Sequence, residues 1–219
     1  MNSPMLQLLV LAGIAVFLIL RLRNVLGTRE GFEKPAAPDQ APARREGPAF
    51  EVIEGGPDLD ITDHFPEDSD QGKALAEMKR LEPSFNVGDF LGGARGAYEM
   101  IVMGYERGEL SEIQPFLSEE IYESFVDGVA AREDQGLTIE ANFIGVRELE
   151  LEDVTLDPDT KEAEVTMRFV AELNSAVRDK AGDIIEGSLT EVKKQKDTWV
   201  FARIMGSDDP NWLLVSTDG

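Results

Sequence analysis

Few side chains in this sequence are suited to covalent or metal chemistry. Cysteine is absent and histidine occurs once, as His64. Without cysteine there is no thiolate that binds a metal or attacks a substrate, and no disulfide. His64 lies in an acidic run, so we expect no catalytic or ligand role for it. The best remaining candidates for a general base are Asp89 and Glu99, but Asp89 fits a helix cap and Glu99 a solvated surface.

Two further motifs resemble ion or phosphate sites. The acidic run at 58–70, DLDITDHFPEDSD, lacks the glycine and the terminal glutamate of a calcium-binding loop. Gly92, Gly93 and Gly96 are closely spaced, but no strand is predicted before them, as a phosphate loop requires. We interpret the run as solvated and the glycines as positions where a helix approaches a neighbouring surface. The sequence therefore predicts no metal, no cofactor and no enzyme activity.

Charge is distributed unevenly along the chain. The formal net charge is −22, yet basic residues outnumber acidic ones between residues 21 and 45. The excess of Asp and Glu therefore lies after that segment, where it repels a phosphate backbone. We expect no nucleic-acid partner, and we interpret the acidic surface mainly as a solubilising one.

The N-terminal segment is strongly apolar. Residues 5–20 read MLQLLVLAGIAVFLIL, and no charged side chain precedes Arg21. This composition favours insertion into a bilayer, and the basic residues that follow, Arg21 and Arg23 among them, favour the cytoplasmic side. We therefore predict a single-pass transmembrane anchor over residues 1–26, with the N-terminus outside and the rest of the chain in the cytoplasm. A cleaved signal peptide is the main alternative.

Residues 27–72 predict a flexible linker. They hold more than half of the chain's 11 prolines, many small or acidic residues, and little apolar periodicity. The folded domain is then expected over residues 73–219, and a linker of this kind lets it reach the bilayer or partners beside it.

The domain's first segment, KALAEMKRLE, predicts a short amphipathic helix. Leu75 and Met78 lie on one side of it, next to Lys79 and Arg80. Two interpretations stay open for these four residues. Either the apolar side packs in the core, or the helix attaches the domain to a membrane surface or a partner groove.

The remaining pattern predicts two longer helices followed by four strands. Asn86 and Ser118 are suited to cap the helices, and Gly136 to end the second. The strands are expected over residues 138–151, 162–174, 184–194 and 199–205, with turns at 178–183 and 196–198. In the first strand the alternation changes phase near Ile144 and Arg147, which indicates bulges and strong curvature.

The expected fold class is therefore α+β, with a curved antiparallel sheet and helices packed on one face. Such a cone has an apolar mouth that is suited to a ligand or an inserted side chain. Aromatic and apolar residues of the helices and strands are its candidate lining, although plain core packing is the usual role of such residues. Two arginines are the polar candidates, for a lipid head group, a peptide carboxylate or a structural ion pair. The candidate pocket or partner-binding residues are Phe90, Tyr98, Val102, Arg132, Arg203 and Trp212.

Several segments together resemble the C-terminal domain of the Tim44-like family of mitochondrial inner-membrane import subunits, and its bacterial TimA-type members most. The likeness covers residues 74–217. Its more specific pieces are SFNVGDFLGGARGAYEMIVMGYERGEL at 84–110, Arg132 before Gly136, AGDIIEG at 181–187, WVFAR at 199–203 and DPNWLLV at 209–215.

This resemblance implies a cone like that of nuclear transport factor two. It also implies a non-enzymatic adaptor or scaffold that gathers proteins, or binds lipid, at the cytoplasmic face of a bacterial inner membrane. Two alternatives remain. One is binding of a small molecule or lipid in the cone, and the other is a secretion-apparatus scaffold whose domain lies outside the cytoplasm.

Overall fold

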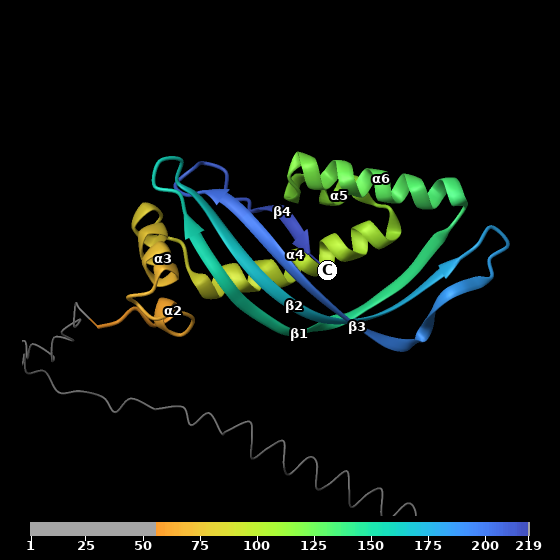
Figure 1. Cartoon of the computed structure of the whole chain (residues 1–219), viewed down its shortest axis with the longest axis horizontal. Coiled ribbons are helices and arrows are strands. Elements are labelled where there is room, and N and C mark those ends of the chain that lie inside the picture. The colour runs from red at the N-terminus through yellow and green to blue at the C-terminus, as the bar shows by residue number, and fades with distance from the viewer. Residues whose placement is uncertain (1–55, 219) are drawn as a thin grey trace, which may run out of the picture. The chain divides into compact units, whose positions relative to one another are not determined.

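The computed structural model describes residues 56–218, in which helices precede all strands (Figure 1). The sheet is an antiparallel meander in the order β1-β2-β3-β4, which confirms the α+β prediction. The helices are α2 (Leu59–Thr62), α3 (Asp70–Leu81), α4 (Val87–Arg107), α5 (Leu110–Ile113), the 3-10 helix η1 (Gln114–Phe116) and α6 (Glu119–Gln135). The strands are β1 (Thr138–Leu156), β2 (Glu162–Arg178), β3 (Ile184–Ile204) and β4 (Leu213–Asp218).

The predicted anchor over residues 1–26 lies outside the described residues, as does the predicted linker up to residue 55. Within residues 56–218, no helix has the length and apolar character that a membrane span requires.

The predicted bulges in the first strand are confirmed. The pairing of β1 with β2 shifts register between Phe143 and Gly145, between Val146 and Glu148, and again nearer the end of β1. Each shift inserts an extra residue into β1 and bends the sheet. Figure 1 shows the long strands curving around α4, which crosses their concave side.

Two predicted strands are in fact one. We expected a turn at residues 196–198, but β3 continues through it, and Lys196, Asp197 and Thr198 pair with β2 in regular antiparallel register. The triplet Lys-Asp-Thr has turn-like composition, yet its backbone groups are satisfied by the β2 ladder. The fourth strand is instead Leu213–Asp218, which pairs with the C-terminal half of β3.

The predicted caps of the two long helices are confirmed. The side chain of Asn86 accepts a hydrogen bond from the Asp89 N–H at 2.9 Å and begins α4. The hydroxyl of Ser118 accepts one from the Ile121 N–H at 3.3 Å and begins α6, which ends at Gly136 with φ of 68°. Only glycine adopts such a φ without steric cost.

The C-terminal boundary of the predicted linker is wrong. The acidic run at 58–70 was expected to be solvated, but Leu59–Thr62 form α2, α3 begins at Asp70, and Ile61 is buried. Asp60 accepts hydrogen bonds from the Val87 and Gly88 N–H groups, at 2.9 and 3.2 Å, and so joins α2 to the N-terminus of α4. A four-residue helix has no periodic pattern of its own, and it is held by these tertiary contacts.

Three closely spaced glycines of α4 do not mark a close approach to another element. Gly92, Gly93 and Gly96 are exposed, and a Cβ built at any of them meets no atom within 4 Å. Our interpretation of these residues as packing glycines is therefore wrong, because a side chain would have room at each of them.

Candidate functional site

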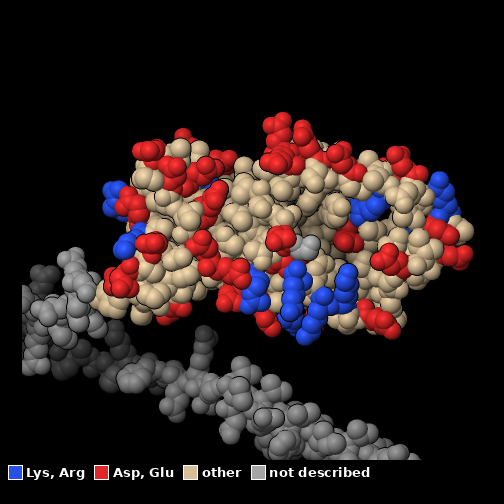
Figure 2. Space-filling view, in the orientation of Figure 1, with Lys and Arg blue, Asp and Glu red and all other residues tan. Residues whose placement is uncertain are grey.

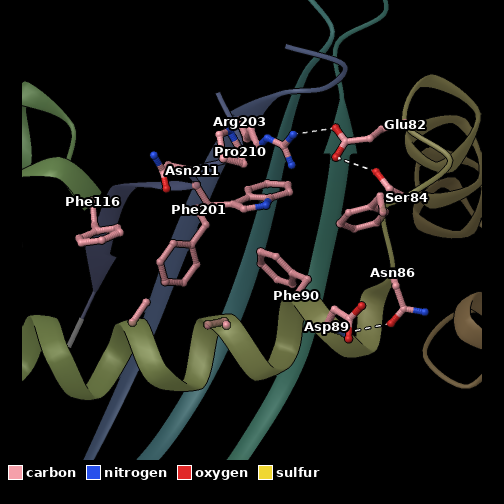
Figure 3. Close-up of a pocket in the computed structure, with 15 residues that line it drawn as sticks. Glu82, Ser84, Asn86, Asp89, Phe90, Phe116, Phe201, Arg203, Pro210 and Asn211 are labelled. Atoms are coloured by element: carbon pink, nitrogen blue, oxygen red, sulfur yellow. Dashed lines mark hydrogen bonds and ion pairs between the residues drawn. The ribbon is translucent and has the colours of Figure 1, made fainter. Parts of the chain in front are cut away.

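An aromatic-lined hollow lies between the N-terminal half of α4, the end of β3 and the segment that leads into β4 (Figure 3). It is open to solvent and has a volume of about 330 Å³. Its lining includes five aromatic rings and a few polar groups. The lining residues used below are Phe85, Phe90, Phe116, Phe201, Trp212, Gly93, Glu82, Asp89, Arg203 and Asn211.

The aromatic rings pack against one another around this cavity. Phe90 meets Trp212 edge to face, with ring centroids 4.8 Å apart, and Phe201 at 6.3 Å. Phe85 lies 6.2 Å from Trp212. Tilted and edge-on ring pairs of this kind add to the stabilisation that burial alone provides. The rings therefore form a fixed apolar wall rather than a set of independent side chains.

An ion pair fixes the rim. Arg203 donates to Glu82 at 2.7 Å through Nη2 and to the carbonyl oxygen of Asp209 at 3.1 Å through Nε. Glu82 also accepts a hydrogen bond from the Gly206 N–H at 3.3 Å. The guanidinium carbon lies 6.0 Å from the centroid of Trp212. These contacts hold the segment between β3 and β4 against the end of α3, and so they position Trp212.

The lining is suited to binding an apolar group. Asp89 is exposed on the first turn of α4, where its N–H is used in the helix cap. His64 is exposed and does not line the cavity. The cavity is within the size range of binding pockets, and it combines an aromatic wall with a charged rim, as such pockets commonly do.

The structure brings together three of the six predicted pocket residues. Phe90, Arg203 and Trp212 line the same cavity. The predicted structural ion pair of Arg203 is present, with Glu82 as its partner.

Tyr98, Val102 and Arg132 do not line this cavity. Tyr98 is fully buried, and its hydroxyl donates a hydrogen bond to Asp197. Arg132 donates to the carbonyl oxygen of Tyr105 at 2.6 Å, and its guanidinium carbon lies 4.6 Å from the Tyr105 ring centroid. Val102 lines a second cavity, between α4 and α6. The helical spacing of Tyr98 and Val102 predicts that both face the sheet, but it does not predict how deeply each is buried.

The membrane-surface interpretation of the 73–82 segment is wrong. Leu75 and Met78 are 1% and 0% exposed, because they pack in the core. Lys79 forms ion pairs with Asp58 at 2.6 Å and Asp60 at 3.0 Å, and Arg80 pairs with Glu77. The alternative that we kept open, core packing, is the correct one.

These contacts shift two pKa values. Burial favours the neutral form of Asp60, but hydrogen bonds from the Val87 N–H, Lys79 and the Gly88 N–H outweigh it and lower the pKa. Burial also disfavours the charged form of Lys79, but its two carboxylate partners outweigh this and raise the pKa.

Sequence reasoning missed several residues that line the two cavities. Glu82, Phe85 and Asn211 line the cavity from segments that join regular elements, where no periodicity marks them. Asp197 is a different case, because it is in phase with the inward-facing Trp199 and Phe201, and that alternation was a usable signal. The expected turn at 196–198 concealed it.

Comparisons with known proteins agree with the resemblance of the sequence. The model of the Tim44-like domain family matches residues 71–219. Mitochondrial import inner membrane translocase subunit TIM44-1 of Arabidopsis thaliana is 20% identical over 161 residues, which cover 71% of this chain and 34% of that protein. The chain thus spans about a third of that relative's length.

One solved structure similar to this chain is the intermembrane space region of the chloroplast protein ARC6. It is 14% identical and covers 50% of this chain and 75% of its own, with a TM-score of 0.35. A TM-score at this level does not establish a shared fold.

Proposed function

Because this chain belongs to the Tim44-like domain family, we propose that it is a non-enzymatic adaptor that binds protein partners beside a membrane. The family match agrees with the resemblance of residues 74–217. The chain matches only about a third of its curated relative. The role in protein translocation that the relative's name describes is therefore proposed for this chain.

The aromatic cavity is the observation that carries the proposal. Five aromatic residues and a rim ion pair surround an open hollow of about 330 Å³. Insertion of one apolar side chain from a partner would remove it from water and would contribute roughly 1.5–3 kcal/mol. Central aromatic pockets of this kind often supply most of the binding energy at protein interfaces.

Two neighbouring glycines of α4 allow a matched test. Gly93 lines the cavity and Gly92 does not, while both are exposed and have room for a side chain. Leucine at either position should stabilise the helix by about 1 kcal/mol. Gly93→Leu should nevertheless fill the cavity mouth and prevent partner binding, whereas Gly92→Leu should not.

The measurement is photo-crosslinking in intact cells. A photoreactive phenylalanine analogue replaces Asn211, which is exposed at the rim, and adducts of the full chain are identified. We expect a protein adduct that disappears in Gly93→Leu and persists in Gly92→Leu. Equal adduct yields in both variants would contradict the proposal, and adducts that contain lipid but no protein would favour the alternative of a lipid-binding cone.

The membrane location is also a proposal, and it rests on the composition of residues 1–26. We propose a single-pass protein of a bacterial inner membrane, with residues 56–218 on the cytoplasmic side. A reporter fused after Gly219 that is active only in the cytoplasm is the expected result. A reporter active only outside would reject this orientation and would favour the secretion scaffold.

A further inference from the structure

A buried carboxylate on the concave side of the sheet has no cationic partner among residues 56–218. Asp197 of β3 is 8% exposed. It accepts hydrogen bonds from the Tyr98 hydroxyl and, at 2.9 Å, from the Gln195 side-chain amide, and both donors bond to Oδ2. Among the ion pairs of residues 56–218, none includes Asp197.

Asp197 lines the second cavity, which has a volume of about 230 Å³ and is bounded by residues of α4, α6, β3 and β4. Its walls combine apolar and polar side chains, and they include three aromatic rings and a second carboxylate, Asp218. Tyr105 and Phe125 face each other there with ring centroids 4.6 Å apart. The aromatic cavity described above shares no lining residue with this one.

The basic residues of the neighbouring described elements do not pair with Asp197. Arg132 is held over Tyr105 and donates to its carbonyl oxygen. Lys196 precedes Asp197 in β3, so its side chain projects from the opposite face of the sheet. Lys193 lies four residues away along the strand, about 13 Å at the usual rise. Figure 2 shows lysine and arginine side chains gathered at the lower edge of this view of the molecule.

A carboxylate removed from water is costly unless it is paired with a cation, and two neutral donors supply only part of the lost solvation. Oδ1 of Asp197 receives no hydrogen bond from the described residues, and it is not one of their fully buried unpaired atoms. Asp197 lines the cavity, so this oxygen is available to a bound group. The faces of the aromatic rings that line this cavity attract a cation. An apolar stem attached to the cation would be buried against the same rings.

We propose that this second cavity binds an organic cation, namely an ammonium or guanidinium group carried on an apolar stem, with Asp197 as the counter-ion. A free amine and a lysine side chain of another protein share this chemistry. The site is separate from the aromatic cavity, so the two proposals stand or fall independently.

The test uses the full chain with the substitution Trp212→Phe. The chain has two tryptophans, so Trp199, which lines the second cavity, is then the only one that remains. Its fluorescence is followed during titration with n-butylammonium, with N-acetyl-lysine methylamide, and with 1-pentanol as an uncharged analogue of the amine. We expect saturable binding of at least one of the two cations, at least about ten-fold tighter than that of 1-pentanol.

Two variants decide the role of the carboxylate. Asp197→Asn removes the charge at constant size and should lower cation affinity at least about ten-fold. Tyr98→Phe keeps the charge and should retain binding. If only n-butylammonium binds, the ligand of the cavity is a free amine. If only the lysine derivative binds, the ligand is a lysine side chain of another protein.

The proposal is overturned if 1-pentanol binds as tightly as both cations, or if Asp197→Asn binds the cations unchanged. The comparison of cation with alcohol needs only the Trp212→Phe chain, so it still decides the matter if the Asp197→Asn variant does not fold.

Discussion

Arg203 of β3 pairs with Glu82, the residue that ends α3, at 2.7 Å, and the side chain of Arg203 is only 8% exposed. This contact connects two elements that are 121 residues apart in sequence. A charge that is nearly removed from water depends strongly on its partner. The pair therefore contributes to stability as well as to the rim of the aromatic cavity.

Glu82→Ala should lower the free energy of unfolding by about 2 kcal/mol, because it leaves Arg203 with only the Asp209 carbonyl as acceptor. Urea denaturation measures this change. Glu77→Ala, which breaks the exposed pair with Arg80, is the matched control and should produce no measurable loss. Equal effects of the two variants would show that the Arg203 pair is no more than a surface contact.

Truncation of Leu75 or Met78 of α3 should lower the stability of the domain, because both side chains pack in the core. Leu75→Ala and Met78→Ala remove side chains that are fully buried, and each should cost roughly 2–5 kcal/mol. Chemical denaturation of each variant measures the loss. A loss below about 1 kcal/mol would contradict the burial of these residues.

Two glycines should respond in opposite ways to the same substitution. A Cβ at Gly72 would overlap the carbonyl oxygen of Pro66, which is backbone and has little room to shift, whereas one at Gly92 meets no atom within 4 Å. Gly92→Ala should therefore raise the thermal midpoint, because alanine is favoured over glycine in a helix by about 1 kcal/mol. Gly72→Ala should lower it, although Gly72 also lies in a helix.

The success of sequence reasoning depended on whether a pattern was local. The caps at Asn86 and Ser118 and the bulges near Ile144 and Arg147 are set by neighbouring residues, and all are present. The inward face of β2 was equally predictable over most of its length, because alternate residues from Ala163 to Leu173 are apolar and all of them are buried. Val170 breaks this pattern, because it is buried on the other face.

Features that depend on distant contacts were missed. The α2 helix exists because Asp60 bonds to the start of α4 and Ile61 is buried, and neither contact leaves a periodic signal. The cavity was predicted in part, since Phe90 and Trp212 line it, but Phe85 enters from a connecting segment. Tyr98 shares the inward face of α4 with Phe90, and only the packed structure shows that it lies in the core.

Acid should weaken the contact between α2 and α4. The pKa of Asp60 is below its ordinary value of 3.8 in the folded state, so the folded state binds this proton less readily than the unfolded chain does. The contribution of the Asp60 carboxylate to stability is complete at a pH above its pKa in the unfolded chain. This contribution is lost as the pH falls from that value through the lower pKa of the folded state. Asp60→Asn should therefore remove part of the stability difference between neutral pH and about pH 3.

The control for that titration is Asp63→Asn. Asp63 is exposed, and among the described residues its carboxylate accepts no hydrogen bond. Urea denaturation curves at a series of pH values should show the parent pH dependence for Asp63→Asn and a weaker one for Asp60→Asn. The same dependence in both variants would exclude Asp60 as a source of acid sensitivity.

Tyr98 should resist ionisation in alkaline solution. Burial raises its pKa well above the ordinary value of 10.0, and the hydrogen bond to Asp197 and the negative charge of that carboxylate raise it further. The folded state therefore retains this proton more strongly than the unfolded chain does. The resulting stability is complete below about pH 10 and decreases as pH rises beyond it.

Ultraviolet absorbance during alkaline titration measures phenolate formation directly. The chain has three tyrosines, and we expect the absorbance step of Tyr98 to coincide with alkaline unfolding, as followed by circular dichroism. In Tyr98→Phe this step should be absent. A Tyr98 step that is complete while the circular dichroism is still native would mean that the hydroxyl is reached by solvent, and that Asp197 lies in a more open cavity than its 8% exposure indicates.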